Sequence, residues 1–179
     1  MRSHHDLTSF LSHVRTSQAS TVSTVYTGTL FEYIVKETLG KVAILSRCGG
    51  ANDRGIDLRG HLRWNEKAKV IVQCKAEVKK QGPRVVRELE GALIGESAET
   101  IGILASRSIF TEEARRQMLR STSPIVMCLV HIAASTTTGS IAQFVWNSAA
   151  HEHLNNVQVQ TQFHNGSDRL QLSLDGKII

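Results

Sequence analysis

Gly55-Ile56-Asp57-Leu58 and Val72-Gln73-Cys74-Lys75 are the two stretches of sequence that decide the fold. Each reads as part of a short strand, and the two strands lie close enough in the chain to pair as a hairpin. Because side chains alternate along a strand, Gln73 and Lys75 point to the same face, and Asp57 can lie beside Gln73. The sequence therefore predicts a polar cluster on otherwise apolar strands.

The chemistry of this cluster indicates metal-assisted hydrolysis. A carboxylate oxygen of Asp57 and the amide oxygen of Gln73 are hard ligands that Mg²⁺ accepts, with waters completing its octahedron. Lys75 can orient or deprotonate a water or stabilise charge on a phosphoryl oxygen, and Glu32, from the first predicted helix, can hold a metal-bound water. Such a set can hydrolyse a phosphodiester. Singly, all four residues have ordinary structural explanations, so the prediction rests on their combination.

Basic charge is concentrated around this cluster. The chain carries a formal charge of +5, but residues 41–87 hold twelve Lys and Arg against four Asp and Glu, a local net of +8. Such a concentration is the footprint of phosphate binding, although a solvated basic face would have the same composition. Free N–H groups at the start of the helix predicted after Gly82 would also attract phosphate. The candidate DNA-binding residues are Arg47, Arg54, Lys79, Lys80, Arg84 and Arg87.

Length and composition exclude several classes of protein. The 179 residues fit one domain, and a hydrophobic content of 41% can supply a core. No apolar run approaches the ~20 residues of a membrane-spanning helix, so no membrane association is expected. Three cysteines without paired spacing indicate neither a disulfide framework nor a zinc site. These features favour a globular protein of a reducing compartment or an organelle matrix.

Apolar periodicity and turn residues predict an α/β domain with a mixed central sheet flanked by helices. We expect a helix from Thr27, as its N-cap, to about Leu39. Pro83 opens a second helix, and Thr111 caps a third. Strands are expected over 42–46, 56–64, 69–76, 100–106, 125–131 and 141–146, with a turn-rich connection over 48–53, a helical turn over 149–154 and a hairpin over 169–179. The order α-β-β-β-α-β-α-β is typical of an α/β domain with a mixed sheet.

The two ends of the chain carry weaker signals. The first 25 residues are rich in Ser and Thr and contain one acid, Asp6, as an organellar transit peptide would. An ordinary flexible terminus would look similar. We therefore divide the chain into a flexible N-terminus or weak transit peptide (1–25), a core domain (26–155) and a C-terminal extension with a β-hairpin (156–179).

The joint pattern resembles the PD-(D/E)XK, or restriction-endonuclease-like, nucleases, and within them the Mrr-type branch, in which Gln precedes X-Lys. The resemblance rests on Phe31-Glu32, Gly55-Ile56-Asp57-Leu58, Val72-Gln73-Cys74-Lys75, Val86-Arg87-Glu88-Leu89-Glu90-Gly91-Ala92 and the region from Gly102 to Ala114. The chain is more closely similar, over about residues 26–150, to a fungal mitochondrial family named for a requirement in respiratory growth. That likeness rests on Tyr26-Thr27-Gly28-Thr29-Leu30-Phe31-Glu32, residues 49–58, Gln73-Cys74-Lys75-Ala76 and Gln143-Phe144-Val145-Trp146-Asn147.

The resemblance implies a restriction-endonuclease-like αβββαβ core, a Mg²⁺ site in which Mn²⁺ could substitute, and DNA as the substrate. By position it makes Asp57 the invariant carboxylate ligand, Gln73 the second ligand, the Cys74 backbone carbonyl the third, Lys75 the catalytic lysine and Glu32 the acid of the first helix. The sequence departs from the commonest pattern at Gln73. A neutral amide binds a divalent ion less strongly than a carboxylate does, so this position bears directly on metal affinity and turnover.

These expectations combine into a function with two rivals. The main interpretation is a Mg²⁺-dependent endodeoxyribonuclease of the mitochondrial matrix, acting on double-stranded or branched DNA in mitochondrial DNA maintenance. Members of the nuclease family often dimerise, so a homodimer is a candidate state. The first rival is a catalytically weak or inactive DNA-binding module of the same fold. The second is an RNA- or protein-binding factor for mitochondrial respiratory function.

Overall fold

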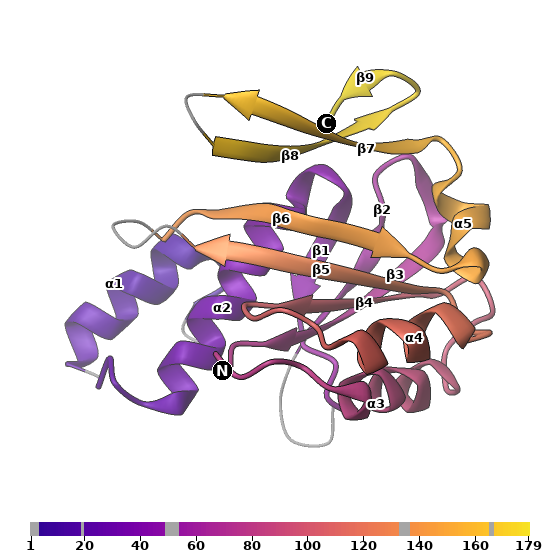
Figure 1. Ribbon diagram of the computed structural model, residues 1–179. Helices are drawn as coiled ribbons and strands as arrows, with labels where there is room; N and C mark the ends of the chain where they lie inside the picture. Colours follow the sequence, from indigo (N-terminus) through magenta and orange to yellow (C-terminus); the bar gives the residue numbers. More distant parts are fainter. Residues whose placement is uncertain (1–3, 19, 49–53, 133–136, 165–166) are drawn as a thin grey trace.

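The computed structural model describes residues 4–18, 20–48, 54–132, 137–164 and 167–179, which build an α/β fold around a six-stranded mixed sheet (Figure 1). The strands lie side by side in chain order: β1 (Ala43–Arg47), β2 (Leu58–Leu62), β3 (Asn65–Lys75), β4 (Ile101–Ser106), β5 (Ile125–Ile132) and β6 (Gly139–Trp146). Strands β3, β4 and β5 are parallel, and the remaining neighbours are antiparallel. This confirms the predicted mixed sheet. The turn-rich connection expected before β2 lies mostly at 49–53, outside the described residues.

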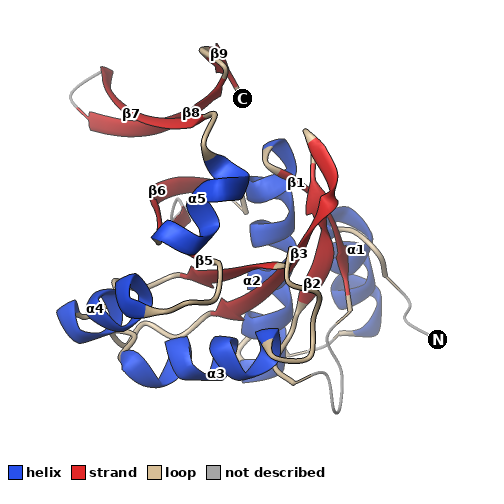
Figure 2. Cartoon of the chain, turned by 90° about the vertical axis from the view of Figure 1, so that its right-hand side faces the viewer, coloured by secondary structure: helices blue, strands red, loops and turns tan. Residues whose placement is uncertain are grey.

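Helices cover both faces of this sheet. They are α1 (Leu7–Ser17), α2 (Thr24–Thr38), the 3₁₀ turn η1 (Leu39–Lys41), α3 (Pro83–Leu93), α4 (Glu112–Arg120) and α5 (Ser148–Leu154). Alternation along β3 divides the core in two, because Val70 and Val72 pack with Phe31 of α2, whereas Ile71 packs with Leu89 of α3. Helices α3 and α4 lie side by side on the second face (Figure 2). The middle strands of the sheet are therefore buried between two apolar layers, whereas β1 and β6 at its edges are partly exposed.

The helix starts follow from capping side chains. The Ser23 hydroxyl accepts a hydrogen bond from the Tyr26 N–H at 3.1 Å, so α2 begins at Thr24 and the predicted cap at Thr27 was wrong. Ser is a better N-cap than Thr, and a cap at Ser23 adds Thr24, Val25 and Tyr26 to the helix. Pro83 at the start of α3 and Thr111 as the cap of α4 are both as predicted.

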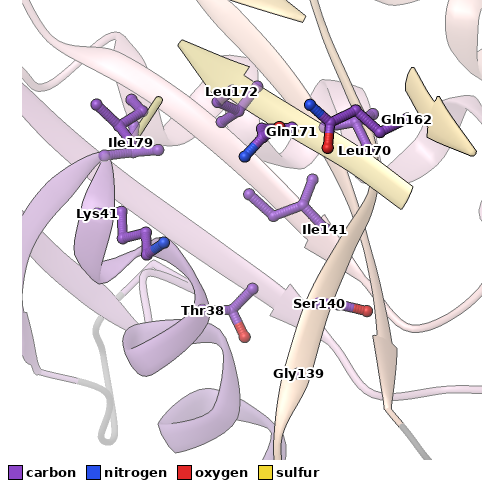
Figure 3. Close-up of a pocket in the computed structure, with 11 residues that line it drawn as sticks. Thr38, Lys41, Gly139, Ser140, Ile141, Gln162, Leu170, Gln171, Leu172 and Ile179 are labelled. Carbon is purple, nitrogen blue, oxygen red and sulfur yellow. The ribbon is translucent and has the colours of Figure 1, made fainter. Parts of the chain in front are cut away.

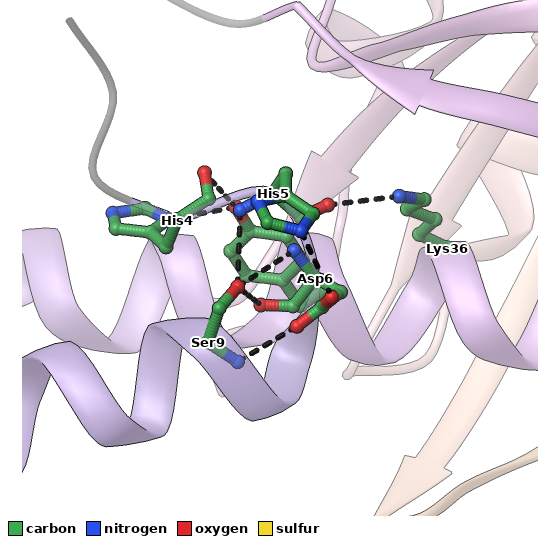
Figure 4. Close-up of polar contacts among 6 residues, drawn as sticks. His4, His5, Asp6, Ser9 and Lys36 are labelled. Atoms are coloured by element: carbon green, nitrogen blue, oxygen red, sulfur yellow. Dashed lines mark hydrogen bonds and ion pairs between the residues drawn. The ribbon is translucent and has the colours of Figure 1, made fainter.

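The N-terminal segment contains a helix that the sequence did not predict. Figure 4 shows how α1 begins: the Asp6 carboxylate accepts from the Ser9 N–H at 2.7 Å, and the Lys36 ammonium of α2 donates to the His5 carbonyl at 3.1 Å. Its buried face, formed by Leu7, Phe10 and Val14, packs with Tyr33 of α2. The structure thus places a helix within the segment that we expected to be a flexible terminus or weak transit peptide, and a capping box and an i, i+3, i+7 apolar spacing stabilise it.

The C-terminal extension forms a second, smaller sheet of β7 (Val157–His164), β8 (Ser167–Leu174) and β9 (Lys177–Ile178). The predicted turn at Asp175-Gly176 joins β8 to β9, whereas β7 was not predicted. Leu172 of β8 packs into the α2-side core, and a cavity of about 440 Å³ lies where this sheet meets β6 and the end of α2 (Figure 3). Among the described residues, no helix has the length and apolarity to span a membrane.

Candidate functional site

Asp57 is held where β2 begins, against the middle of the sheet. Its N–H donates to the Val72 carbonyl at 2.9 Å, and its own carbonyl accepts from the Cys48 N–H at 2.8 Å. Its carboxylate oxygen Oδ2 accepts from the Cys74 N–H of β3 at 2.6 Å. The predicted hairpin therefore brings Asp57 to the Gln73-Cys74-Lys75 stretch. A hydrogen bond from a backbone N–H favours the ionised form of a carboxylate, which a metal ligand requires.

Gln73 is the most buried of the predicted site residues, with a side chain only 2% exposed. Its Nε2 donates to the Arg54 carbonyl at 3.4 Å, whereas its Oε1 is buried and has no hydrogen-bond partner among the described residues. Gly55 makes room for the amide, because a Cβ there would lie 2.8 Å from Nε2 and the backbone has a φ of +75°. A buried carbonyl oxygen without a hydrogen-bond partner lowers the stability of the folded state by about 1–3 kcal/mol. We therefore expect Gln73 Oε1 to bind a ligand or a water.

Lys75 ends β3 and points toward α3. Its Nζ lies 2.8 Å from Glu88 Oε2, and the other oxygen of Glu88 lies 3.2 Å from Arg84 Nε. The hydrogen bond from Lys75, followed by the charges of Lys75 and Arg84, holds the pKa of Glu88 below its ordinary value although burial acts the other way. The sequence analysis missed Glu88 as a member of the site. Its i, i+4 spacing from Arg84 was the available signal.

Glu32 belongs to α2 and forms an ion pair with Arg47 of β1. The Arg47 guanidinium donates to the Glu32 carboxylate, lies 3.5 Å from the Thr29 hydroxyl and stands 5.5 Å from the centroid of the Tyr33 ring. Burial lowers the pKa of Arg47, but the hydrogen bond and charge of Glu32 outweigh this and raise it. Glu32 and Arg47, predicted for catalysis and DNA binding, thus form a shielded pair that joins α2 to β1.

The other predicted DNA-binding residues fall at two places. Lys79, Lys80, Arg84 and Arg87 are exposed and surround the start of α3. Arg54 is exposed as well, but a Cβ built on Gly95 would lie 2.2 Å from its Nη1, which places this guanidinium just beyond the opposite end of α3. Four of the six cations therefore share one surface beside Lys75.

The donor set fits a magnesium ion of low protein coordination. Within the described part of the chain, no group of three or more His, Cys, Asp or Glu residues could hold a metal. Asp57 supplies one carboxylate and Gln73 one unpaired amide oxygen, while the Cys74 carbonyl lies on the Asp57 side of β3, because its N–H already points there. Mg²⁺ keeps several waters and needs only one or two carboxylates, so this set is chemically compatible with it.

The thiols of Cys74 and Cys128 are poorly suited to act as nucleophiles. Burial raises the pKa of Cys74 well above its ordinary value, and the nearby charges of Asp57 and Glu32 raise it further. Burial also raises the pKa of Cys128 to about 12. A thiolate is therefore disfavoured at both positions.

Comparison with known proteins places the chain in a family. The family model described as "Required for respiratory growth protein 7" matches residues 23–68 and 63–163, a span that contains every site residue discussed above. The chain belongs to this family. The predicted likeness to a family named for respiratory growth is thus confirmed, and no solved structure matches the chain.

Relatives within the family are mitochondrial proteins. The mitochondrial protein C824.03c of Schizosaccharomyces pombe is 39% identical over 152 residues, covering 82% of this chain and 61% of the relative's length. The mitochondrial protein named Required for respiratory growth protein 7 in Saccharomyces cerevisiae is 26% identical over 178 residues, covering 71% of this chain and 74% of the relative. The chain thus spans about three fifths of the first relative, and the predicted mitochondrial localisation is confirmed.

Proposed function

We propose that this chain is a mitochondrial factor for respiratory growth that binds DNA in the matrix and cleaves it with Mg²⁺ at the site of Asp57, Gln73 and Lys75. The first half of the proposal extends the names of the relatives to this chain. The second half adds a molecular activity, which those names do not state. The observation that carries it is the buried, unpaired Oε1 of Gln73, on the residue next to the one whose N–H binds the Asp57 carboxylate.

The arrangement of elements supports a restriction-endonuclease-like core. The elements α2, β1, β2, β3, α3 and β4 follow one another in the αβββαβ order that the resemblance implies. In this arrangement Asp57 stands at the start of β2, and Gln73 and Lys75 stand at the end of β3, as the PD-(D/E)XK pattern requires. Exposed cations around the start of α3 then flank the site on the side where a DNA backbone would lie.

Each residue has a task in the proposed reaction. A bound Mg²⁺ would supply Lewis-acid stabilisation of the scissile phosphate and a water of lowered pKa. Asp57, Gln73 Oε1 and the Cys74 carbonyl would hold it. The Lys75 ammonium would stabilise the developing phosphoryl charge or orient the attacking water, while Glu88 keeps it at the end of β3. Glu32 contributes by fixing α2 on β1 through Arg47.

A nicking and linearisation assay on plasmid and branched DNA tests this activity. We expect cleavage with Mg²⁺ or Mn²⁺, and a loss of at least about 100-fold in Asp57→Ala and in Lys75→Ala, since both act on the transition state. Lys69→Ala is the matched control, because Lys69 is an exposed lysine on the same strand, outside the site. No cleavage by the wild type, or equal cleavage by all three variants, would exclude the nuclease.

A non-catalytic DNA-binding module is the second candidate, and internal pairing of the site favours it. Lys75 is bonded to Glu88, Glu32 to Arg47 and the Asp57 carboxylate to the Cys74 N–H. Under this alternative the wild type cuts nothing, yet its DNA affinity falls steeply with salt as bound counterions are displaced. Retained cross-linking to RNA or to a protein complex without DNA affinity would instead favour the respiratory factor that acts through those partners.

A further inference from the structure

The chain continues past the ends of β3 and β4 as two segments that lie side by side. Together they form a projection that we call the ridge, defined as residues 76–81 and 107–110. Two hydrogen bonds join the two segments, from the Ser108 hydroxyl to the Val78 carbonyl (2.9 Å) and from the Gln81 N–H to the Ile109 carbonyl (3.0 Å). Two more tie them to the residues next to them in the chain, from the Arg107 N–H to the Lys75 carbonyl (3.0 Å) and from the Thr111 N–H to the Gln81 carbonyl (2.9 Å). The ridge is therefore a braced structure at the edge of the site.

The surface of the ridge combines apolar and cationic side chains. Val78 is 80% exposed and Ile109 is 46% exposed. Exposure of such large apolar side chains to water is unfavourable. Lys79, Lys80 and Arg107, all exposed, stand beside them in the chain. These hydrogen bonds hold the segments that carry Val78 and Ile109 next to each other, so both exposed apolar residues belong to the same ridge as the cations.

Charge complementarity selects the partner of this surface. Lys79, Lys80 and Arg107 would bind phosphates, while the apolar side chains need a dry neighbour such as the face of a base. Glu112 and Glu113 follow the ridge in the chain, in the first turn of α4, and would repel a polyanion, so we expect the polyanion to approach from the start of α3, where Lys75 is bonded to Glu88. Nucleic-acid-binding proteins use this combination when an apolar wedge enters between base steps.

We propose that the ridge inserts Val78 and Ile109 at an unstacked base step, which makes branched, nicked or bulged DNA the preferred ligand over a continuous duplex. This inference rests on the proposed function, because it names the DNA structure that the Lys75 site receives. Insertion into a regular duplex requires unstacking that costs a few kcal/mol per step, whereas an interrupted duplex is already open. The ridge thereby adds structural selectivity to a site whose cations are indifferent to sequence.

Fluorescence of 2-aminopurine placed at a branch point or opposite a nick tests the insertion. Binding of the wild type, measured in EDTA so that nothing is cut, should raise the fluorescence and show tighter affinity for the interrupted DNA than for a continuous duplex. Val78→Ser with Ile109→Ser should lower this affinity ratio about tenfold and remove the fluorescence rise. Ile94→Ser is the matched control, since Ile94 is 86% exposed at the far end of α3.

The outcomes separate the ridge from the site. An unchanged affinity ratio in the double variant, with DNA binding intact, overturns the ridge alone and leaves the proposed function standing. A wild type without DNA affinity overturns both. Anionic phospholipid vesicles form the second arm, and a double variant that loses vesicle binding while it keeps the DNA ratio assigns the ridge to a membrane surface and overturns the inference.

Discussion

Two ion pairs lie on opposite faces of the same sheet and differ in how closely they are enclosed. Glu32 and Arg47 join α2 to β1, with side chains 14% and 15% exposed. Lys75 and Glu88 join β3 to α3, with side chains 21% and 37% exposed. Both pairs contain a residue predicted to work in catalysis. The more enclosed pair is expected to stabilise the fold, and the more exposed pair can make its charge available to a substrate.

The contacts around each pair give different answers. Arg47 also lies over the Tyr33 ring, so its guanidinium interacts with two residues of α2, Glu32 and Tyr33. Glu88 instead has two cationic partners, Lys75 and Arg84. If Lys75 turns toward a phosphate, Arg84 still neutralises Glu88, and the exchange leaves no isolated charge. The enclosed pair is suited to structure and the open pair to chemistry.

Replacing Arg47 should break the enclosed pair with the largest effect. In Arg47→Met we expect the free energy of unfolding to fall by about 3 kcal/mol, because Glu32 is left shielded from water without a counter-charge. In Lys75→Met the fall should stay below about 1 kcal/mol, since Glu88 keeps Arg84 and contact with water. Urea unfolding followed by circular dichroism measures both values.

Arg59→Met controls for the loss of an ordinary surface pair. Arg59 binds Glu96 through two hydrogen bonds of 3.0 and 2.9 Å, and its side chain is largely accessible. We expect a fall of less than about 1 kcal/mol. If Arg47→Met destabilises the protein no more than Arg59→Met does, enclosure does not distinguish the two faces and the comparison fails.

The sequence predicted the strands around this site better than the ends of the chain. Alternating or apolar runs bounded by turn residues located β1 to β6, because a buried strand leaves a strong local pattern. Helix α1 was missed because only Leu7, Phe10 and Val14 mark it, within a Ser- and Thr-rich segment typical of a flexible terminus. Strand β7 was missed although its glutamines alternate with other residues as in a half-buried strand, and its pairing with β8 is tertiary information.

The residues proposed for the candidate site carry local signals, but the pairing among them does not. Spacing along a strand placed Gln73 and Lys75 together, and the hairpin brought Asp57 to them. The bond between Glu32 and Arg47 depends on how α2 is set against β1, which no local pattern records. Helical spacing is a local signal for the pair of Arg84 and Glu88, but no such spacing indicates the bond from Lys75 to Glu88. Chemistry-bearing residues leave local signals, whereas their counter-ions come from packing.

Gln73→Glu tests the α3 face of the sheet, which also carries the open pair of Lys75 and Glu88. A carboxylate at this buried position should lower the free energy of unfolding by about 2 kcal/mol without metal, because it lies near Asp57 and out of water. Millimolar Mg²⁺ should restore most of this loss by ligation. Thermal unfolding with and without Mg²⁺ gives the difference, which should be smaller in the wild type.

Gln81→Glu is the matched control for this metal effect. Gln81 is buried to a similar degree, but it lies in the ridge, away from Asp57. The control should lose stability as well, yet Mg²⁺ should not restore it. If Mg²⁺ changes the stability of the two variants equally, Gln73 is not a metal ligand. Its unpaired Oε1 would then have to bind something other than a metal.

The smallest expected effect is the loss of stability when acid protonates Glu88 in its open pair with Lys75. The pKa of Glu88 is held below its ordinary value, mainly by the hydrogen bond from Lys75, so the folded state favours the carboxylate. Its contribution to stability is present above about pH 4.5 and disappears as the pH falls through the lowered pKa. At neutral pH we expect Glu88→Gln to be less stable than the wild type by less than about 1 kcal/mol, and the gap should close in acid.

A double-mutant cycle with Lys75→Met identifies which cation holds Glu88. If Lys75 is the main partner, the pH-dependent gap caused by Glu88→Gln should shrink by more than half in the Lys75→Met background. What remains there measures Arg84. A gap that is unchanged by Lys75→Met means that Arg84 already carries the interaction. Release of Lys75 toward a phosphate would then cost the fold nothing, and Glu88 would have no part in positioning it.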